Sequence, residues 1–330
     1  MTTMTAHEAL YRALSEEMQR DARVMLMGEG VATLHRDLVE AFGAERVRNT
    51  PLSEAIVAGC AVGAAASGLR PVVDMLYAPF LTYAMDAIVN SAGKLRYMSG
   101  GQFAFPMVVL ANTGAGWGVG AQHSHNLEAW FVHSPGLKVV MPSTPADFYG
   151  LLKSAIRDDN PVVFLNDMTL LHQPGDLTDE AEAGLVPIGR AAVRRPGSDV
   201  TLVSYAKTVH TCLVAAHTLA QQGIQAEVLD LRSLKPLDMG TVLASVRRTG
   251  RLVVVHEAGP LCSVGAEVAA QVAERVFDAL KAPVRRLSSP DVPTPASHPL
   301  EQAFVPQAAQ IVQTVQELLG VPAEAQLSTS

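Results

Sequence analysis

Short apolar runs alternate with helical patterns along most of the chain. Leu10, Leu14 and Met18 recur at the spacing of one helix face before the apolar run that begins at Val24. The apolar runs, most of them rich in β-branched residues, are 24–29, 71–77, 106–112, 137–143, 161–166, 199–206, 225–232, 251–258 and 284–289. Apolar strands that alternate with helices predict parallel sheets covered by helices on both faces, which is an α/β fold.

A polar and acidic segment at 171–187 interrupts this alternation and contains Pro174, Gly175 and several carboxylates. Segments punctuated by proline and glycine are typical of connections between folded parts. We therefore place a domain boundary after residue 186, so that 1–186 forms a first α/β domain and 187–330 forms a second, smaller one.

Composition narrows the class of protein. The chain has 330 residues, 48% of them hydrophobic, which is enough for two cores. Its formal net charge is −7 without a long basic run, which argues against binding to nucleic acid or to an anionic membrane surface. No stretch approaches the roughly 18–20 apolar residues that span a bilayer, and no apolar signal core is seen. Three cysteines without CxxC spacing predict no disulfide framework, so we expect a cytoplasmic protein.

The segment GAGWGVGAQHSHN at 114–126 allows three interpretations. Gly116, Gly118 and Ala121 satisfy a G-x-G-x-x-A dinucleotide fingerprint, but the next predicted strand lacks the acidic residue that binds a ribose. His123 and His125 stand two apart, as metal ligands on an extended backbone can, yet a convincing third ligand is missing. The third interpretation, which we favour, is a mobile glycine loop that carries His123 to a substrate for proton transfer.

Several segments, in collinear order, resemble one protein family. They are NTPLSEA (49–55), GAAASGLRPVVDM (63–75), GKLRYMSGGQ (93–102), GAQHS (120–124), AWFVHSPGLKVV (129–140), SAIRDDNPVVF (154–164) and VLDLRSLKPLD (229–238). From about Ala6 to Pro306 the chain resembles the β subunit of the thiamin-diphosphate-dependent decarboxylating component of 2-oxo acid dehydrogenase complexes. Pyruvate, branched-chain and acetoin dehydrogenases belong to this family. The resemblance implies a transketolase-like pyrimidine-binding domain over 1–186 and a transketolase-type C-terminal domain over 187–330.

The resemblance also implies roles for individual residues. Glu54 matches the catalytic glutamate that hydrogen-bonds the aminopyrimidine ring of thiamin diphosphate, although by position alone it could simply stabilise a helix N-terminus. Phe80 matches the residue that stacks on that ring, with Leu76 and Tyr83 in neighbouring cofactor-lining positions. His123 matches a catalytic histidine that reaches the active site from a flexible loop and transfers protons during reductive acylation of a lipoyl group.

Two further segments bear on metal ions and on the substrate. In some relatives a segment like SAIRDDNP (154–161) forms a monovalent-cation site, and an ordinary helix C-terminus explains the same residues equally well. The residues that would hold K⁺ here are Met107, Ala155, Asp158 and Asn160. Pro79, Tyr83 and NDMTLLH (166–172) depart from the family's pattern and leave the shape of the substrate open.

The chain contains no GDG motif, which in this family opens the segment that binds the cofactor's diphosphate through Mg²⁺. The resemblance therefore implies half an active site, completed by an α subunit that carries the diphosphate and Mg²⁺ in a heterotetramer of two α and two β chains. The leading hypothesis is decarboxylation of a 2-oxo acid, or cleavage of acetoin, with transfer of the acyl group to a lipoyl acyltransferase. One alternative is an α/β pair that transfers a two-carbon acyl or ketol unit to a carrier protein outside such a complex. Another is a non-catalytic structural partner.

Overall fold

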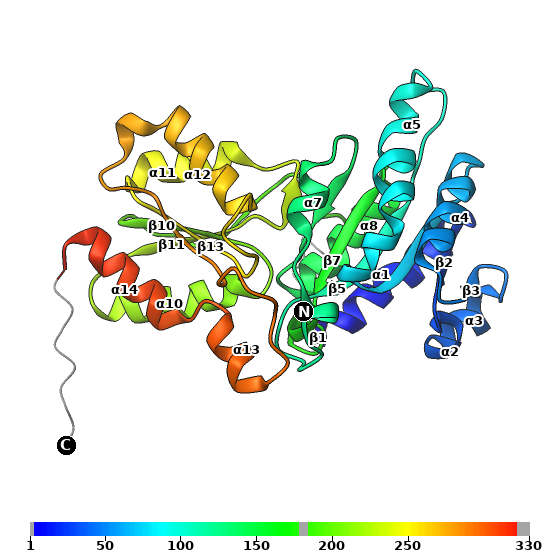
Figure 1. The fold of residues 1–330 in the computed structure, drawn as a ribbon, viewed down its shortest axis with the longest axis horizontal. Coiled ribbons are helices and arrows are strands. Elements are labelled where there is room, and N and C mark those ends of the chain that lie inside the picture. Colours follow the sequence, from blue (N-terminus) through cyan, green and yellow to red (C-terminus); the bar gives the residue numbers. More distant parts are fainter. Residues whose placement is uncertain (1–2, 178–183, 322–330) are drawn as a thin grey trace. The chain divides into compact units, whose positions relative to one another are not determined.

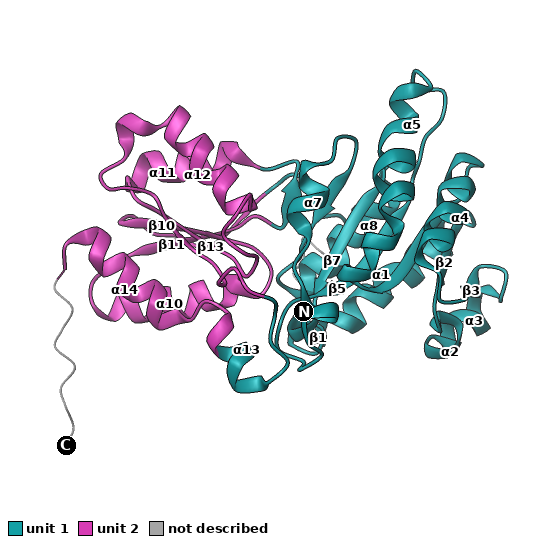
Figure 2. Cartoon of the chain, viewed as in Figure 1, with its two compact units in different colours: residues 1–190, 232–237, 293–302 teal, residues 191–231, 238–292, 303–330 magenta. Residues whose placement is uncertain are grey.

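The computed structural model describes residues 3–177 and 184–321, and Figure 1 shows how the elements follow the chain. The chain divides into two compact units, which Figure 2 colours separately. Unit 1 comprises Met1–Arg190, Arg232–Leu237 and Pro293–Gln302, and unit 2 comprises Ala191–Leu231, Asp238–Val292 and Ala303–Ser330. The domain boundary after residue 186 stays a prediction, and part of the acidic segment on which it rests, 178–183, lies outside the described residues.

Unit 1 contains a seven-stranded sheet and a separate two-stranded sheet. Its strands are β1 (Thr3–Thr5), β2 (Val24–Gly28), β3 (Val47–Asn49), β4 (Arg70–Tyr77), β5 (Val108–Thr113), β6 (Lys138–Val140), β7 (Val162–Asp167), β8 (Pro174–Asp176) and β12 (Ser233–Lys235). The large sheet has the order β12-β6-β7-β5-β4-β2-β3, and all its neighbouring pairs are parallel except β12 with β6. β1 pairs with β8 in the antiparallel sense.

Helices cover both faces of the large sheet, as the sequence predicts. Every residue of β7 is buried, and because side chains alternate between the two faces of a strand, both faces must be covered. The helical segments are α1 (Ala6–Arg20), α2 (Val31–Leu34), α3 (Arg36–Phe42), α4 (Glu54–Ala66), η1 (Ala78–Ala84), η2 (Asp86–Ala92), α5 (Gly93–Met98), α6 (Ala121–Ser124), α7 (Glu128–His133), α8 (Pro145–Arg157) and η3 (Met168–Leu170). α13 (His298–Phe304) begins in unit 1 and ends in unit 2.

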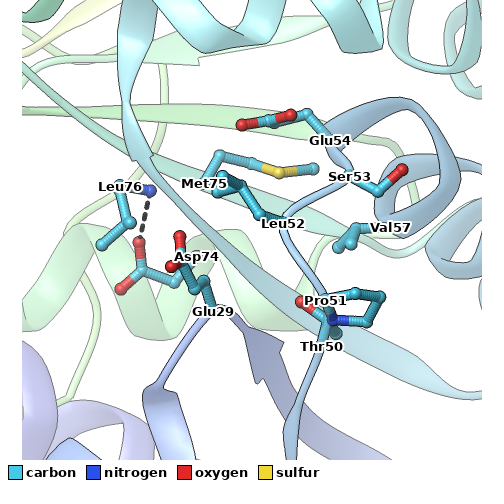
Figure 3. Close-up of a pocket in the computed structure, with 10 residues that line it drawn as sticks. All are labelled: Glu29, Thr50, Pro51, Leu52, Ser53, Glu54, Val57, Asp74, Met75 and Leu76. Carbon is cyan, nitrogen blue, oxygen red and sulfur yellow. Dashed lines mark hydrogen bonds between the residues drawn. The ribbon is translucent and has the colours of Figure 1, made fainter.

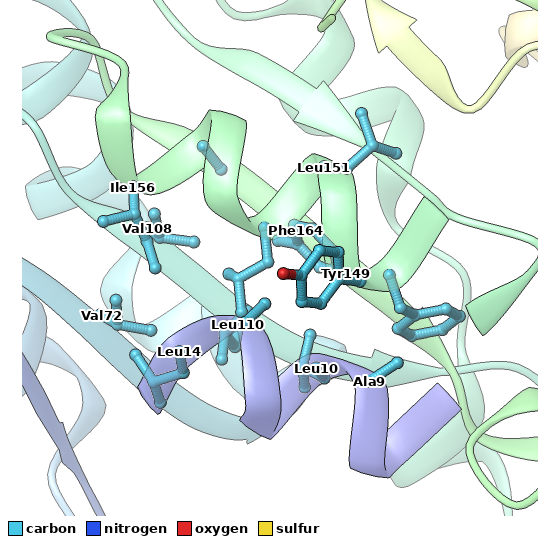
Figure 4. Packing of buried hydrophobic residues seen from close by; sticks show 14 of the residues in the cluster. Ala9, Leu10, Leu14, Val72, Val108, Leu110, Tyr149, Leu151, Ile156 and Phe164 are labelled. Carbon is cyan, nitrogen blue, oxygen red and sulfur yellow. The ribbon is translucent and has the colours of Figure 1, made fainter. Parts of the chain in front are cut away.

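The core of unit 1 forms where α1 and α8 pack on the sheet. Figure 4 shows Leu10 and Leu14 of α1 packed near Leu110 of β5 and Phe164 of β7, all in one buried cluster. α1 begins with a capping box, in which Thr5 Oγ1 accepts from Glu8 N at 3.2 Å and Glu8 Oε2 accepts from Thr5 N at 2.7 Å. The capping box and the apolar stripe thus fix where α1 starts and which face it buries.

Unit 2 is a smaller α/β layer structure. Its elements are β9 (Ala192–Arg195), β10 (Val200–Ser204), α10 (Thr208–Gln221), β11 (Ala226–Asp230), α11 (Met239–Thr249), β13 (Leu252–Val255), α12 (Val264–Arg275), η4 (Phe277–Ala279), β14 (Arg285–Leu287) and α14 (Ala308–Leu319). The sheet order is β14-β13-β10-β11-β9, and only the pair formed by β9 and β11 is antiparallel. α10 and α14 contribute to one buried cluster with the strands, which includes Leu219 and Ile311.

The predicted α/β architecture is confirmed, and every apolar run singled out in the sequence contains a strand. The strands that the sequence analysis missed, β1, β3, β8, β9 and β12, have three or four residues each. Edge strands are often short and charged, and such strands leave no apolar run in a sequence.

Candidate active site

The candidate residues gather at one edge of the large sheet of unit 1. β2 pairs with β4, and β4 with β5, all in parallel, so the carboxyl ends of these strands lie along the same edge. Glu29 directly follows β2, and Thr113 ends β5 just before residues 114–120, which we call the glycine loop. α4 begins five residues after β3, which lies next to β2. Carboxyl edges of parallel sheets are the usual position of ligand sites in α/β folds.

Glu54 lines a pocket at this edge. In Figure 3 this residue, the first of α4, borders the pocket together with Asp74 and Leu76 from the end of β4. No group among the described residues hydrogen-bonds the Glu54 carboxylate. This carboxylate is therefore available to exchange a proton with a ligand nitrogen. The cavity volume is about 20 Å³, close to the space of one water molecule, whereas small-molecule sites have about 300–1,000 Å³. The pocket beside Glu54 is therefore too small to enclose a ligand of that size by itself.

Asp74 is a pocket residue that the sequence analysis missed. Burial raises the pKa of its carboxyl, and a hydrogen bond that Oδ1 accepts from Leu76 N at 2.9 Å partly offsets this effect. Asp74 could have been identified from the sequence, because it is an acidic residue close to the end of a predicted apolar strand, and functional side chains are common at that position.

Leu76 occupies a strained backbone conformation in the same pocket. Its φ of 57° lies in the left-handed region, which residues other than glycine rarely adopt. Such strain costs on the order of 1–3 kcal/mol and occurs most often at ligand sites. The structure thus places two of the predicted cofactor-lining residues, Glu54 and Leu76, around one pocket.

His123 lies between two aromatic rings. Its ring centroid is 4.8 Å from that of Tyr77 and 5.3 Å from that of Phe80, and both contacts are edge to face. The imidazole is half-buried, and no described group hydrogen-bonds its nitrogen atoms. The two rings hold the imidazole by packing alone, which leaves both nitrogens available to a substrate. The structure places His123 beside Phe80, two of the predicted site residues, and adds Tyr77, which the sequence analysis missed.

Tyr83 and Pro79 occupy η1, the 3₁₀ turn that follows β4. The Tyr83 side chain is 71% exposed and makes no ring contact with His123 or Phe80 among the described residues. That Tyr83 lines the cofactor site stays a prediction. Pro79 stands in the first turn of η1, where a missing backbone N–H costs nothing, so the fold accommodates this departure from the family pattern.

The departure at 166–172 contacts the glycine loop. A Cβ added to Gly116 would lie 2.5 Å from Thr169 Cγ2, so the two residues are in close contact. The indole of Trp117 stacks on the imidazole of His172, with centroids 5.8 Å apart and planes 6° apart. Thr169 is itself held, because its hydroxyl donates to Asp167 Oδ1 at 2.6 Å. The unusual segment therefore forms one side of the glycine loop's surroundings.

The four residues proposed for a monovalent cation lie near one another, and most of their polar groups already have partners. Asp158 accepts from Lys138 Nζ and from Asn160 Nδ2, and these bonds lower the pKa of its carboxyl despite burial. Arg96 donates to Asn160 Oδ1 at 2.9 Å. The carbonyls of Met107 and Ala155 each accept one backbone hydrogen bond. The Asp158 carboxylate is paired with an ammonium group, and the Asp158 carbonyl accepts from Arg70 Nη1 at 3.2 Å, so a cation would compete with both partners.

Three other findings concern the chain outside this site. Cys60, Cys212 and Cys262 are free thiols. Within 3–177 and 184–321, no three His, Cys, Asp or Glu side chains come together as metal ligands would. In the same ranges, no helix has both the length and the apolar character needed to cross a membrane.

Two known domain families match successive parts of the chain. Residues 2–173 match the transketolase pyrimidine-binding domain, and residues 189–311 match the transketolase C-terminal domain. The site described above lies within the first of these matches.

Individual relatives resemble the chain over most of its length. The mitochondrial pyruvate dehydrogenase E1 component subunit beta-2 of Oryza sativa is 46% identical over 317 residues, covering 94% of this chain and 84% of that one. The acetoin:2,6-dichlorophenolindophenol oxidoreductase subunit beta of Cupriavidus necator is 44% identical over 319 residues, covering 92% and 94%. A solved structure of a split-gene transketolase, described as an inactive β4 tetramer, matches with a TM-score of 0.80 at 25% identity, covering 97% and 99%.

Proposed function

Because the chain belongs to the family of β subunits of pyruvate dehydrogenase E1 components and acetoin oxidoreductases, we propose that it forms half of a thiamin-diphosphate-dependent active site. The enzyme decarboxylates a 2-oxo acid, or cleaves acetoin, and passes the acyl group to a lipoyl acyltransferase. The observation that carries the proposal is the Glu54 carboxylate at the same sheet edge as His123: within 3–177 and 184–321, neither this carboxylate nor the His123 nitrogens have a hydrogen-bond partner.

The described residues suit the pyrimidine half of the cofactor. Glu54 would hydrogen-bond a pyrimidine ring nitrogen and hold or release a proton there. Phe80 would offer a ring for the pyrimidine to stack on, with Leu76 beside it in the wall of the pocket. When bound, thiamin diphosphate supplies the nucleophilic carbon and the electron sink for decarboxylation. His123 would exchange a proton with the substrate or with the incoming lipoyl group.

An α subunit must supply the other half of the site. The pocket beside Glu54 is too small to enclose a cofactor by itself, and the chain has no GDG segment for the diphosphate and Mg²⁺. α4 exposes an apolar face that includes Ile56, 63% exposed, with Gly59 and Gly63 beside it. Apart from the backbone of α4 itself, no atom of the described residues lies within 4 Å of a Cβ added to either glycine, so a neighbouring backbone can approach α4 closely there. This face suits the α subunit, in an assembly of two α and two β chains.

Finer features of the enzyme complete the proposal. A monovalent cation such as K⁺ would bind the carbonyl oxygens of Met107, Ala155, Asp158 and Asn160. The free thiols of the chain suit the reducing cytoplasm.

The proposal is tested with the chain co-purified with an α-type partner that carries a GDG segment. Pyruvate, branched 2-oxo acids, acetoin and a ketose phosphate are assayed with a dye or a lipoyl domain as acceptor. We expect thiamin-diphosphate-dependent turnover of a 2-oxo acid or acetoin. Glu54→Gln and His123→Ala should each lower it by about 100-fold or more, because general acid–base groups contribute roughly 10²–10⁴-fold. Glu40→Gln and His217→Ala, which alter exposed residues, are the matched controls. Unchanged turnover in both active-site variants would overturn the assignment of roles.

A second candidate is transfer of a two-carbon ketol unit outside a dehydrogenase complex. The likeness to a split-gene transketolase favours it, but that identity is 25%, against 44–46% for the dehydrogenase-type β subunits. Turnover of the ketose phosphate alone in the assay above would support this candidate. Normal turnover without Glu54 and His123 would instead fit a non-catalytic structural partner.

A further inference from the structure

The backbone conformation of the glycine loop can point several N–H groups toward one position. Gly114, Gly116, Gly118 and Gly120 have φ values of 93°, 125°, 68° and 77°, all in the region that favours glycine. Alternation of such residues with ordinary ones can turn successive backbone N–H groups toward one point and form an anion-binding nest. In the dinucleotide interpretation of this loop the anion would be a phosphate, but the structure places an anion of the chain itself there.

That anion is Glu301, in α13. Its Oε1 accepts from Gly116 N at 2.8 Å and from Gly118 N at 3.0 Å, and its Oε2 lies 3.1 Å from Gly118 N. The side chain is 1% exposed, so its charge is stabilised mainly by these amide donors. His298 Nδ1 lies 3.7 Å from Oε2 on an exposed side chain. The carboxylate therefore accepts from the amides that the glycine loop turns toward it.

The glycine loop is also held from its other side. Thr169 packs against Gly116, and His172 stacks on Trp117, as described above. A loop that is bonded by a carboxylate on one side and packed against side chains on the other has a defined shape rather than that of a free hinge. The amides of Gly116 and Gly118 should consequently exchange slowly with solvent.

The shape of the loop determines where His123 lies. Gly120 O accepts from His123 N at 3.1 Å, and Gly114 N donates to Ser124 O at 3.0 Å, so both ends of the loop bond the turn that carries the imidazole. Because no residue that the structure describes hydrogen-bonds the imidazole, packing against Tyr77 and Phe80 and these backbone bonds are what orient it. A displaced loop would displace His123 from its two rings.

We propose that Glu301 is a positioning residue, whose carboxylate sets the glycine loop and through it the place of His123. The catalytic consequence rests on the proposed function, in which His123 moves a proton, whereas the structural consequence does not. A misplacement of about 1 Å at a reacting group can cost about 100-fold in rate, so the expected catalytic effect is large.

Two substitutions separate the carboxylate's role from simple damage to the fold. Glu301→Gln keeps the side chain's size but replaces one acceptor oxygen with an amide that cannot accept from a backbone N–H. Glu301→Ala removes both acceptors. Leu300→Ala, on the same helix and 59% exposed in the parent, is the matched control. Circular dichroism and gel filtration verify that each variant folds and assembles with the α-type partner.

The kinetic test uses the assembled enzyme. Glu301→Ala should lower kcat by about 10- to 100-fold and Glu301→Gln by less, while the apparent affinity for thiamin diphosphate stays within about twofold. In a His123→Ala background the same substitutions should cost little more, because their effect acts through His123. Full kcat in folded Glu301 variants, or a loss of the same size without His123, would overturn the proposal.

A second readout does not depend on activity. Hydrogen exchange of the Gly116 and Gly118 amides, followed by mass spectrometry on the full-length chain with and without the α-type partner, should accelerate at least about tenfold in both Glu301 variants and not in Leu300→Ala. If wild-type enzyme turns over none of the substrates, the proposed function fails, while this exchange result still decides the role of Glu301. Unchanged exchange in Glu301→Ala would contradict it in either case.

Discussion

His256 should make the stability of unit 2 depend on pH. The residue follows β13 and is 0% exposed, its Nδ1 lies 3.0 Å from Ala258 O, and its ring stacks on Tyr205 at 6.0 Å. Gly265 lies directly against the ring, because a Cβ added to it would be 2.4 Å from His256 Nε2, and that nitrogen is buried with no hydrogen-bond partner among the described residues. The pKa of His256 is lowered from 6.5 to about 4, mainly because the ring is buried; the Ala258 carbonyl opposes this shift, and the charge of the nearby Arg286 adds to it.

The sign and size of the effect follow from proton linkage. The unfolded chain binds a proton to His256 below pH 6.5, but the folded chain does so only below about pH 4. The contribution to stability is therefore complete above pH 6.5 and is lost as the pH falls from 6.5 toward 4. At about 1.4 kcal/mol for each unit of pKa difference, the free energy of unfolding should fall by about 2 kcal/mol between pH 7 and pH 5, and by about 3 kcal/mol in all.

Hydrogen exchange is the suitable measurement, because it reports on unit 2 peptide by peptide. Tryptophan fluorescence would report on unit 1, because both tryptophans of the chain, Trp117 and Trp130, lie there. Protection factors of peptides from β10 and β13, corrected for intrinsic exchange, should fall about 20- to 30-fold from pH 7 to pH 5. His256→Gln should remove most of this fall, whatever it does to stability at pH 7. His217→Gln, at an exposed position, should preserve it. The same pH dependence in His256→Gln would refute the reasoning.

Three other substitutions test the fold and the site. Leu14→Ala should lower the free energy of unfolding by about 3 kcal/mol in denaturant titrations, because it opens a cavity in a fully packed core, and a loss below about 1 kcal/mol would contradict that packing. Glu17→Gln should cost about 1–2 kcal/mol at pH 7, since it leaves the half-exposed Arg157 without its carboxylate, and an unchanged melting curve would rule out a stabilising pair. Gly116→Ala should lower kcat about 10-fold or more in assembled enzyme, because the new Cβ would lie 2.5 Å from Thr169 Cγ2 and the φ of this residue is 125°. A variant with the kcat of the wild type would show that the loop adjusts freely.

The strands that could be predicted from the sequence are those whose burial on both faces requires apolar residues along their whole length. β5 and β7 are buried on both faces, so their sequences read as continuous apolar runs. β12 could not be found in this way, because its three residues join the sheet of unit 1 by pairing with β6, almost a hundred residues earlier in the chain. Pairing between distant segments is a property of the topology and leaves no local pattern.

The same distinction applies to the candidate site. Glu54 and His123 stand in local motifs that the family resemblance identifies, and Asp74 had a local signal at the end of its strand. Glu301 had none, because it meets Gly116 across 185 positions of sequence. From the glycines of the loop we predicted a mobile segment, and only the structure shows that they bind a carboxylate of the chain itself.

The most direct test of the central claim, that this chain holds half of a thiamin-diphosphate site, is a titration. The chain and an α-type partner are purified separately, and thiamin-diphosphate-dependent turnover of pyruvate and of acetoin is measured as one is added to the other. The account predicts no turnover by either chain alone and a rise that saturates at one α per β. Tight cofactor binding and turnover by this chain alone would contradict it.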